Sequence, residues 1–497
     1  MKLADLRNPV RFDWLADQGF RLVATPYVSG AYEARKFLEQ LPVPVIPLHE
    51  LTTGHEGGIY NGPQFRRSYV NDREHGVRFL SSADIMQADF TNIPLLLAKD
   101  ARSSKLAYLQ VEPGVTLISC SGTVGRTCYV RPDMAGFWSS QDVLKVVANR
   151  EKIPPGYLYI FLNSRFGIPM VTAQASGSMI QHLEPEHIAD LPVPRFSREV
   201  EEEIHRYVQA AADRRARFQA GVTAATNDLF ESIGLPELID YRWHREPRAV
   251  GFEVRHIDSA SLRAMNYDAR ARRLANIIAS VPHRTLGEIC DGGELSRGNR
   301  FSRIPADPGH GFLLVGQEQL FWTLPEGRWI ALKPGEVGAL KAHDESIMVA
   351  CRGLLTEGAL IGRASFVTGS WLRYVYTEDL LRVRSGAADF PSAYLFAFMR
   401  SEVAFRMLRS LVSGTGPQDI NAVLRREIPV PECTPADRER IAETVRQAYR
   451  WRGEADELEN RAQELLDAAV RAAAGADLRQ NGDLAHRPEQ ADGTGDG

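Results

Sequence analysis

The sequence lacks most of the features that mark a secreted protein or a membrane protein. Its five cysteines among 497 residues form no Cys-x-x-Cys pair, so neither a disulfide framework nor a zinc knuckle is indicated. No apolar run approaches the roughly 20 residues that a helix needs to span a membrane. We therefore expect a cytoplasmic protein in a reducing compartment, with no membrane segment.

An excess of either charge is also lacking. The 59 Lys and Arg residues against 63 Asp and Glu residues leave a formal net charge of −4. Overall basicity thus gives no sign of nucleic acid, although a local basic face would be enough to bind it. The hydrophobic content of 44% and charged content of 25% are ordinary for a soluble globular protein, and the length predicts two to four domains.

Motifs that carry catalysis are missing as well. No Gly-x-Gly-x-x-Gly opens a helix after a strand, and no Walker phosphate loop is present. The glycine-rich stretch 121–125 lacks the required lysine and following helix, so it predicts a turn between strands. Pro132-Asp133 is followed by Asp142 and Lys145 at a spacing one residue too long for a nuclease, and we interpret 142–145 and 379–382 as sheet edges. The histidines show no metal-ligand spacing. We expect no metal, no cofactor and no catalysis in this chain.

What the chain does contain is an internal repeat at a constant spacing of 237 residues. A glycine turn, a Pro-Val-Pro and an isoleucine occur twice, as Ser176-Gly177-Ser178, Pro192-Val193-Pro194 and Ile204, and as Ser413-Gly414-Thr415, Pro429-Val430-Pro431 and Ile441. The same spacing relates Val124-Gly125-Arg126 to Ile361-Gly362-Arg363 and persists to Leu229 and Leu466. An unbroken register over this length indicates a tandem duplication.

Each copy has the pattern of an α+β unit. Short helices are predicted at 31–38 and 267–278, followed by strand-like starts at 45–51 and 285–289. Short β-branched and aromatic runs bounded by Gly, Pro, Asn and Asp then predict a compact mixed sheet, at 77–80, 115–120, 127–130, 312–315, 346–351 and 365–367. Helices are expected to open at Pro155 and at Pro391.

A long helix follows each Pro-Val-Pro. Apolar or small residues recur at steps of three and four from Ile204 to Ile233 and from Ile441 to Val470, which predicts helices of about 50 Å. Such a seam needs a partner. We favour pairing of the two helices, because no other element is long enough to cover either seam; the alternative is packing of each helix on its own unit. The composition beyond Val470 predicts a disordered tail.

These segments predict the organisation of the chain. It comprises a lead-in with a short helix (1–43), a first globular unit (44–195), a long helix (196–236), a linker with a lead-in helix (237–281), a second globular unit (282–431), a second long helix (432–472) and a disordered tail (473–497).

The order, duplication and spacing of these features resemble the specificity (S) subunit of type I restriction-modification systems, the HsdS family. The resemblance extends from about residue 21 to residue 470. It includes the openings 47–51 and 285–289, the stretches 79–85 and 314–320, the Ser-Gly turns and the Pro-hydrophobic-Pro closures. A Glu-Gln pair that follows the second proline in many members is absent here, where the chain reads Arg198-Glu199-Val200-Glu201-Glu202 and Thr434-Pro435-Ala436-Asp437-Arg438.

The resemblance implies a fold and a function. Each globular unit would be a target-recognition domain for one half of a bipartite double-stranded DNA site. The paired helices would form a coiled-coil-like spacer that sets the unread gap and docks methyltransferase (M) subunits. In that family two M subunits carry S-adenosylmethionine and the methylating residues, and an R subunit adds ATP-driven translocation and cleavage. This chain would then need no cofactor of its own.

Candidate DNA-binding residues follow from what DNA offers. Phosphates attract cations, and base edges in the major groove accept forked or amide side chains. Where the two repeats differ, we select Gln64, Arg66, Arg67, Lys99, Arg102 and Lys105 in the first, and Arg297, Asn299, Arg300, Arg303, Lys341 and Arg352 in the second. Shared candidates for phosphate are Arg126 and Arg363, with the turns Ser176, Gly177, Ser178 and Ser413, Gly414, Thr415. The alternatives are solvated surface charge for the arginines and helix termination for Gly177 and Gly414.

Three other functions stay open from the sequence. The chain could be an enzyme with an unrecognised motif, a scaffold whose twin units bind protein, or a recognition component of another phage-defence system. Salt dependence separates DNA binding from scaffolding, because counterion release makes DNA binding weaken steeply with added salt.

Overall fold

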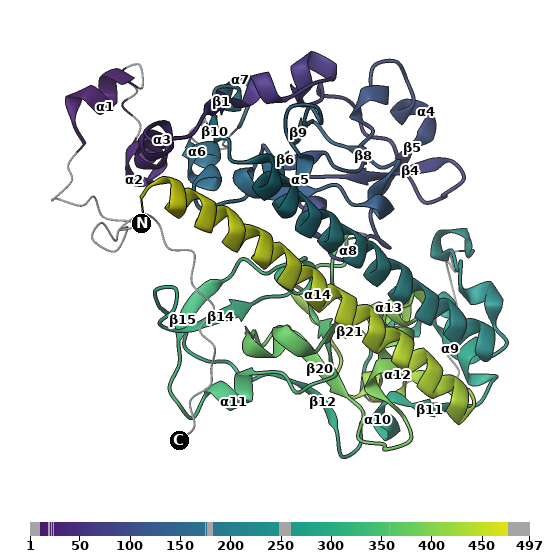
Figure 1. The fold of residues 1–497 in the computed structure, drawn as a ribbon. Coiled ribbons are helices and arrows are strands. Elements are labelled where there is room, and N and C mark those ends of the chain that lie inside the picture. Colours follow the sequence, from purple (N-terminus) through teal and green to yellow (C-terminus); the bar gives the residue numbers. More distant parts are fainter. Residues whose placement is uncertain are drawn as a thin grey trace. The chain divides into compact units, whose positions relative to one another are not determined.

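The computed structural model describes residues 10–17, 20, 22, 24–173, 175, 182–247, 260–356 and 358–475 (Figure 1). The chain forms two compact units, the first made of Met1–Ala216 with Glu454–Gly497 and the second of Arg217–Gly453. Both boundaries fall inside the long helices α8 (Arg198–Ser232) and α14 (Pro435–Ala473), so each unit contains a part of each helix.

The first unit contains two four-stranded sheets. One has the order β2-β9-β6-β7, with all neighbours antiparallel, and consists of β2 (Ile59–Tyr60), β9 (Val143–Val146), β6 (Thr116–Ser119) and β7 (Thr127–Tyr129). The other has the order β3-β5-β4-β8, with β4 and β8 parallel, and consists of β3 (Tyr69–Val70), β5 (Leu95–Leu97), β4 (Gly76–Leu80) and β8 (Trp138–Ser139).

The second unit repeats this topology strand for strand. The order β12-β20-β16-β18 matches the first sheet, with β12 (Glu294–Arg297), β20 (Leu380–Arg384), β16 (Ser346–Ala350) and β18 (Ala364–Val367). The order β13-β15-β14-β19 matches the second, with β13 (Ile304–Pro305), β15 (Arg328–Ala331), β14 (Phe312–Val315) and β19 (Val375–Tyr376), and β14 and β19 are again parallel. The predicted duplication of an α+β unit is therefore confirmed.

Each Pro-Val-Pro segment is a short strand. β10 (Pro192–Pro194) pairs antiparallel with β1 (Val45–Pro47), and β23 (Pro429–Pro431) pairs in the same way with β11 (His283–Thr285). Each is a two-stranded sheet, so the missing proline N–H groups can face away from the ladder. The buried hydroxyl of Tyr157 donates to the Pro194 carbonyl, and that of Tyr394 donates to the Pro431 carbonyl at 2.9 Å. The shared tyrosine thus fixes the shared strand in both units.

Two expectations about strands are wrong. The start 285–289 is a strand only at Thr285: after β11 the chain forms the short helix α10 (Leu286–Ile289), because Thr285 and Glu288 make a reciprocal capping box. The stretches 142–145 and 379–382 are not sheet edges, since β9 and β20 are inner strands of their sheets. Every residue of β9 is buried, including Lys145, whose amino group donates to the carbonyls of Val143 (2.8 Å) and Ser140 (3.2 Å).

The long helices pair, as the sequence predicts. At 1.5 Å per residue, α8 extends for about 52 Å and α14 for about 58 Å. Within the first unit Arg214 contacts Glu454 (2.6 Å), and within the second Asp228 contacts Arg440 (2.7 Å), so the helices are antiparallel (Figure 1).

The seams of the two helices also face the globular units. Helix α5 (Pro155–Leu162) is buried throughout and packs with Ile204 and Val208 of α8 and Leu466 of α14. In the second unit, Thr226 of α8 donates to the Ala397 carbonyl of the wholly buried α12 (Ser392–Met399) at 3.1 Å. The two alternatives for covering the seams are therefore both realised.

The remaining elements connect these parts. The predicted lead-in helices are confirmed as α3 (Ala31–Glu39) and α9 (Ala269–Ala279). The others are α1 (Phe12–Asp17), α2 (Thr25–Val28), α4 (Ala98–Ala101), α6 (Gly167–Ala173), α7 (Pro185–Ile188), α11 (Val337–Leu340), α13 (Glu402–Ser410), β17 (Arg352–Gly353), β21 (Val412–Ser413) and β22 (Gln418–Ile420).

In the described part of the chain, no helix is both long and apolar enough to cross a membrane. Most of the predicted tail, from residue 476 on, lies outside the described residues.

Candidate nucleic-acid interface

The basic segments selected in the first unit meet at one end of a sheet. The loop 61–68 leads from β2 into β3, which pairs with β5, and β5 leads directly into α4. The amide of Leu97 donates to the Ser68 carbonyl at 2.8 Å, which joins the end of the loop to the start of α4. Exposed polar and basic side chains follow on both segments: Gln64 and Arg66 on the loop, and Lys99, Arg102 and Lys105 on and after the helix.

The second unit places its candidates at the corresponding position. The loop 298–303 leads from β12 into β13, which pairs with β15, and α11 follows β15. Asn299 and Arg300 are exposed on this loop. Lys341 follows α11 directly, with its ammonium 5.9 Å from the ring centroid of Phe312. Residues selected for their chemistry and for the difference between the repeats thus occupy the same part of the fold in both units.

Several of the selected arginines contact acidic side chains. Arg67 donates to Asp142 at 2.7 Å, and this bond raises the pKa of Arg67 although burial alone would lower it. Arg297 donates to Asp419 and Arg303 donates to Glu378, each at 2.8 Å. Arg352, on β17, lies 3.6 Å from Asp379. These guanidinium groups are oriented by the protein itself.

The shared arginines follow equivalent glycine turns. Gly125 and Gly362 both have φ of 94°, which favours glycine, and a Cβ on Gly125 would lie 2.4 Å from Thr172. Arg126 is partly buried. The Arg363 guanidinium lies 3.4 Å from the ring centroid of Phe405 and 3.3 Å from Glu402, and burial lowers its pKa to about 10. Arg363 thus points toward α13 in this structure.

The two Ser-Gly turns are described unequally. Ser176, Gly177 and Ser178 lie outside the described residues. Ser413 ends β21, and Gly414 (φ 91°) and Thr415 form the exposed turn of the hairpin that continues into β22. Helix α13 ends at Ser410, so helix termination by Gly414, the alternative to a DNA role, is wrong.

The constant spacing concealed one equivalent pair of residues. The amides of Cys120 and Cys351 donate to the carbonyls of Asp142 (2.9 Å) and Asp379 (3.1 Å), which places the two cysteines at the same point in their units. They are not 237 residues apart, because the hairpin 351–363 is longer than its counterpart 120–126. Burial raises the pKa of both thiols to about 12, so they pack as neutral groups. The matching stretches 115–120 and 346–351, both ending in cysteine, contained this signal.

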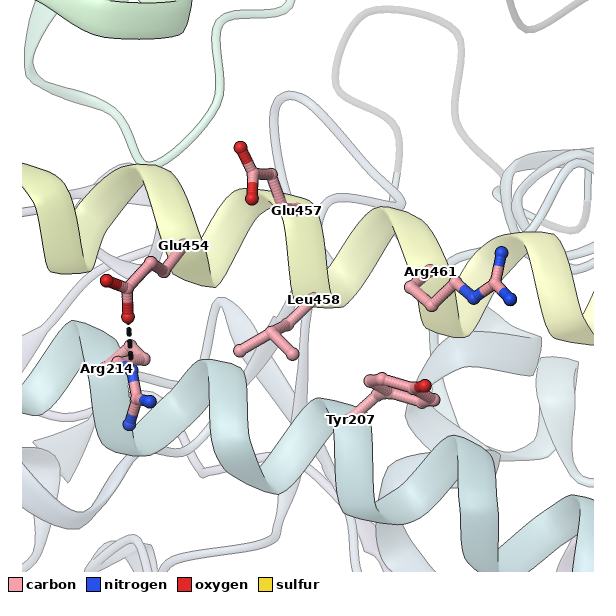
Figure 2. Close-up of a pocket in the computed structure, with 6 residues that line it drawn as sticks. All are labelled: Tyr207, Arg214, Glu454, Glu457, Leu458 and Arg461. Carbon is pink, nitrogen blue, oxygen red and sulfur yellow. Dashed lines mark hydrogen bonds and ion pairs between the residues drawn. The ribbon is translucent and has the colours of Figure 1, made fainter.

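A shallow groove lies on the paired helices of the first unit (Figure 2). Its volume is about 340 Å³, and its floor and rim are Tyr207, Arg214, Glu454, Glu457, Leu458 and Arg461. The Arg214–Glu454 ion pair closes one end of the row of side chains. The lining offers no nucleophile with a neighbouring base, so we assign no catalytic chemistry to the groove.

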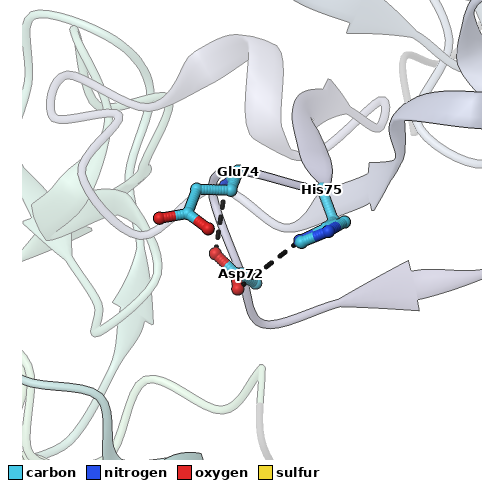
Figure 3. Close-up of side chains that lie close together, drawn as sticks. All are labelled: Asp72, Glu74 and His75. Atoms are coloured by element: carbon cyan, nitrogen blue, oxygen red, sulfur yellow. Dashed lines mark hydrogen bonds and ion pairs between the residues drawn. The ribbon is translucent and has the colours of Figure 1, made fainter.

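One turn of the first unit gathers three potential metal ligands, Asp72, Glu74 and His75 (Figure 3). The Glu74 amide donates to the Asp72 carboxylate at 3.0 Å, and His75 Nδ1 lies 3.6 Å from the same carboxylate. Glu74 and His75 are exposed, and their contacts with Asp72 are those of a tight turn. The cluster therefore indicates a turn and carries no metal assignment.

The fold and this surface define a duplicated α+β protein with a basic loop in each unit and a pair of long helices. No family model and no curated protein matches the sequence. Among solved structures, the S subunit of a type I restriction-modification system from M. genitalium is similar over 87% of this chain and 96% of its own, with 10% identity and a TM-score of 0.36.

Two further solved structures are similar over the same share of this chain. The HsdS subunit from Thermoanaerobacter tengcongensis matches over 87% of this chain and 98% of its own, with 15% identity and a TM-score of 0.26. A chain from a structure on the assembly and conformational transition of the type I R-M system matches over 87% and 99%, with 15% identity and a TM-score of 0.25. The resemblance to S subunits is thus found again among solved structures.

Proposed function

We propose that this chain is a DNA-recognition subunit without catalysis of its own, in which each unit reads one half of a bipartite site. The observation that carries this proposal is the contrast between the four-stranded sheets, which both units share and which we call the frame, and the loops, which differ between the units. The same strand order presents Gln64 and Arg66 in one unit and Asn299 and Arg300 in the other. Arginine pairs with guanine edges, and glutamine or asparagine pairs with adenine edges, in the major groove. One frame with two sets of readers suits two different half-sites.

The partners proposed for this subunit are methyltransferase subunits. They would dock on the paired helices α8 and α14, bring S-adenosylmethionine and methylate the DNA, with restriction subunits joining the same complex. The helices would set the length of the unread gap between the half-sites. The charged outer face of α14, on which Glu454 and Glu457 are exposed, supports docking of a protein partner here.

The test is to co-express the chain with its methyltransferase partner and map modified bases across the host genome. We expect a two-part motif with a fixed gap. Replacing Gln64 and Arg66 with alanine should relax one half of the motif, and replacing Asn299 and Arg300 should relax the other half. Each pair of substitutions is the control for the other, because the unaffected half reports that the complex still assembles.

Binding in solution separates DNA recognition from scaffolding. For DNA, the logarithm of the association constant should fall with the logarithm of salt by about 0.9 for each phosphate neutralised. If no motif is found, no duplex is bound and a protein partner is retained at high salt, the scaffold function replaces this proposal.

A further inference from the structure

Both candidate recognition loops are attached to the frame at both ends. In the first unit, Asn61 at the start of the loop 61–68 donates to Glu184 at 3.0 Å, and Arg67 near its end donates to Asp142 at 2.7 Å. In the second unit, Arg297 just before the loop 298–303 donates to Asp419, and Arg303 at its end donates to Glu378, each at 2.8 Å. Two unlike loops thus have the same two attachments.

The attachment points correspond between the units. Asp142 immediately precedes β9, and Glu378 and Asp379 immediately precede β20, the equivalent inner strand. Glu184 and Asp419 lie on segments that pair with the strand end in each sheet, through the bridges Ser121–His182 and Arg352–Asp419. The frame therefore supplies acidic groups at two fixed places, and each loop supplies its own donors.

Two of the anchoring arginines, Arg67 and Arg297, are less exposed than the residues between the anchors. The Arg67 side chain is 25% exposed and lies against the ring of Phe79, and Arg297 is 29% exposed and also donates to the Glu378 carbonyl at 3.0 Å. A guanidinium in such a charge-assisted bond has fewer donors and a partly neutralised charge left for a phosphate. Arg66, Asn299 and Arg300 are exposed between the anchors.

Building on the proposed function, we propose that Arg67, Arg297 and Arg303 are positioning residues that hold the loops, while Gln64, Arg66, Asn299 and Arg300 contact DNA. A loop that is ordered before binding loses less conformational entropy when it binds, so its anchors contribute to affinity without touching the ligand. The proposal separates arginines that are neighbours in sequence, such as Arg66 and Arg67, into different roles.

The experiment measures binding of a fluorescein-labelled duplex that carries the mapped bipartite site, by anisotropy at several salt concentrations, with the assembled complex. Arg66→Gln should lower the salt slope by about 0.9, as for one lost phosphate contact, or abolish the preference at one base pair. Arg67→Gln should weaken binding about tenfold at an unchanged slope, the cost of ordering roughly one or two side chains. Its effect should be confined to the first half-site.

Asp142→Asn decides between positioning and contact, because it leaves Arg67 in place and removes the carboxylate charge that holds it. If Arg67 positions the loop, the substitution weakens binding as Arg67→Gln does. If Arg67 contacts phosphate, the freed guanidinium strengthens binding and steepens the salt slope, which would overturn the assignment. Arg303→Gln tests the same claim in the second unit, where recognition of the first half-site should stay intact.

The failures of the two proposals are distinguishable. Absence of any bipartite motif or duplex binding in the unsubstituted complex contradicts the DNA-recognition function itself. A normal motif with a lower salt slope for Arg67→Gln and Arg303→Gln contradicts only the positioning role. A loss of recognition at both half-sites on substitution in one loop would also contradict it, since the anchors act within one unit.

Discussion

Arg215 and Arg452 are equivalent residues of the two copies, but one is surrounded by carboxylates and the other by a carbonyl and aromatic rings. Arg215 lies in the first unit against the carboxylates of Glu459 and Asp456, and Tyr159 donates to Glu459 at 2.5 Å. Arg452 lies in the second unit, where it donates to the Trp322 carbonyl at 2.8 Å. Its guanidinium is 4.1 Å from the ring centroid of Trp371. A duplicated buried cation has been kept, and each copy compensates it by different chemistry.

The connections from β10 to α8 and from β23 to α14 each contain an ion pair at equivalent positions, with the two charges exchanged between the copies. In the first unit Arg195 precedes the helix and pairs with Glu201 at 2.6 Å. In the second unit Glu432 has the place of Arg195 and pairs with Arg438, which has the place of Glu201. The interaction is conserved between the copies while both residues are inverted. The repeat therefore preserves positions and contacts more strictly than residue types.

The largest difference between the units should come from the buried ion cluster. We expect Glu459→Ala to destabilise the first unit by about 3–5 kcal/mol, because it leaves the buried Arg215 partly uncompensated. Glu457→Ala, exposed on the same helix, is the matched control and should change stability by no more than about 0.5 kcal/mol. Urea-dependent hydrogen exchange of the β6 and β9 amides measures the effect. A loss below about 1 kcal/mol for Glu459→Ala would show that the cluster is not strongly coupled.

The pH dependence of stability should differ between the units, because Lys145 on β9 and Arg382 on β20 occupy equivalent positions of the inner strands. Burial lowers the pKa of Lys145 to about 7 from its ordinary value of 10.5. Between these values the unfolded chain binds the proton and the folded chain releases it, so the first unit should become more stable as pH rises, by about 1.4 kcal/mol per pH unit. Arg382 stays charged, and the second unit should show no such rise.

Hydrogen exchange of the two units between pH 7 and about 8.5 tests this difference. The upper limit matters because the buried thiols of Cys120 and Cys351 have a pKa raised to about 12, so their contribution to stability falls once unfolded thiols ionise near pH 9. Lys145→Met should remove the dependence from the first unit. A flat profile in the unsubstituted protein would mean that Lys145 keeps its proton when buried.

The fold could be predicted from the sequence where the two copies have kept a constant spacing, and less well elsewhere. The spacing of 237 residues relates Tyr157 to Tyr394, the two Pro-Val-Pro segments and the two long helices, because equivalent residues from β7 onward stay the same distance apart in sequence. It could not relate Cys120 to Cys351, since the intervening hairpins differ in length. The capping box at Thr285 has a signal in the sequence, Thr285-x-x-Glu288, but the apolar residues beside it fit a short helix and a strand start equally well.

The sequence predicted candidate DNA-binding residues, but not the different roles that we propose for them. The sequence selected Gln64, Arg66, Asn299 and Arg300 where the repeats differ, and the structure places them on the loops 61–68 and 298–303 at the same end of equivalent sheets. It could not separate Arg66 from Arg67. That distinction depends on Asp142, which is distant in sequence and comes near Arg67 only through the folding of β9 beside the loop.

Where the copies agree, substitutions should have equal effects. Tyr157→Phe and Tyr394→Phe each remove the hydroxyl that satisfies a buried proline carbonyl, and we expect each to cost its unit about 1–2 kcal/mol. Hydrogen exchange in each unit provides the measurement, and the unsubstituted unit is the internal control. Costs that differ by more than about 1 kcal/mol would mean that the two tyrosine hydrogen bonds do not contribute equally to stability.

The smallest effect is expected at Arg214, which is the sequence neighbour of Arg215. Its ion pair with Glu454 has a length of 2.6 Å, but the two side chains are 33% and 45% exposed at the rim of the groove. Solvent screening limits such a pair to about 0–1 kcal/mol, and Arg214→Ala should cost no more than this, with half or more of the cost lost in 1 M salt. Arg215→Ala, one residue along the helix, should cost several times as much and respond little to salt, since it leaves Asp456 and Glu459 buried without their cation. Equal costs at these two positions would show that burial does not control the strength of the ion pairs between the helices.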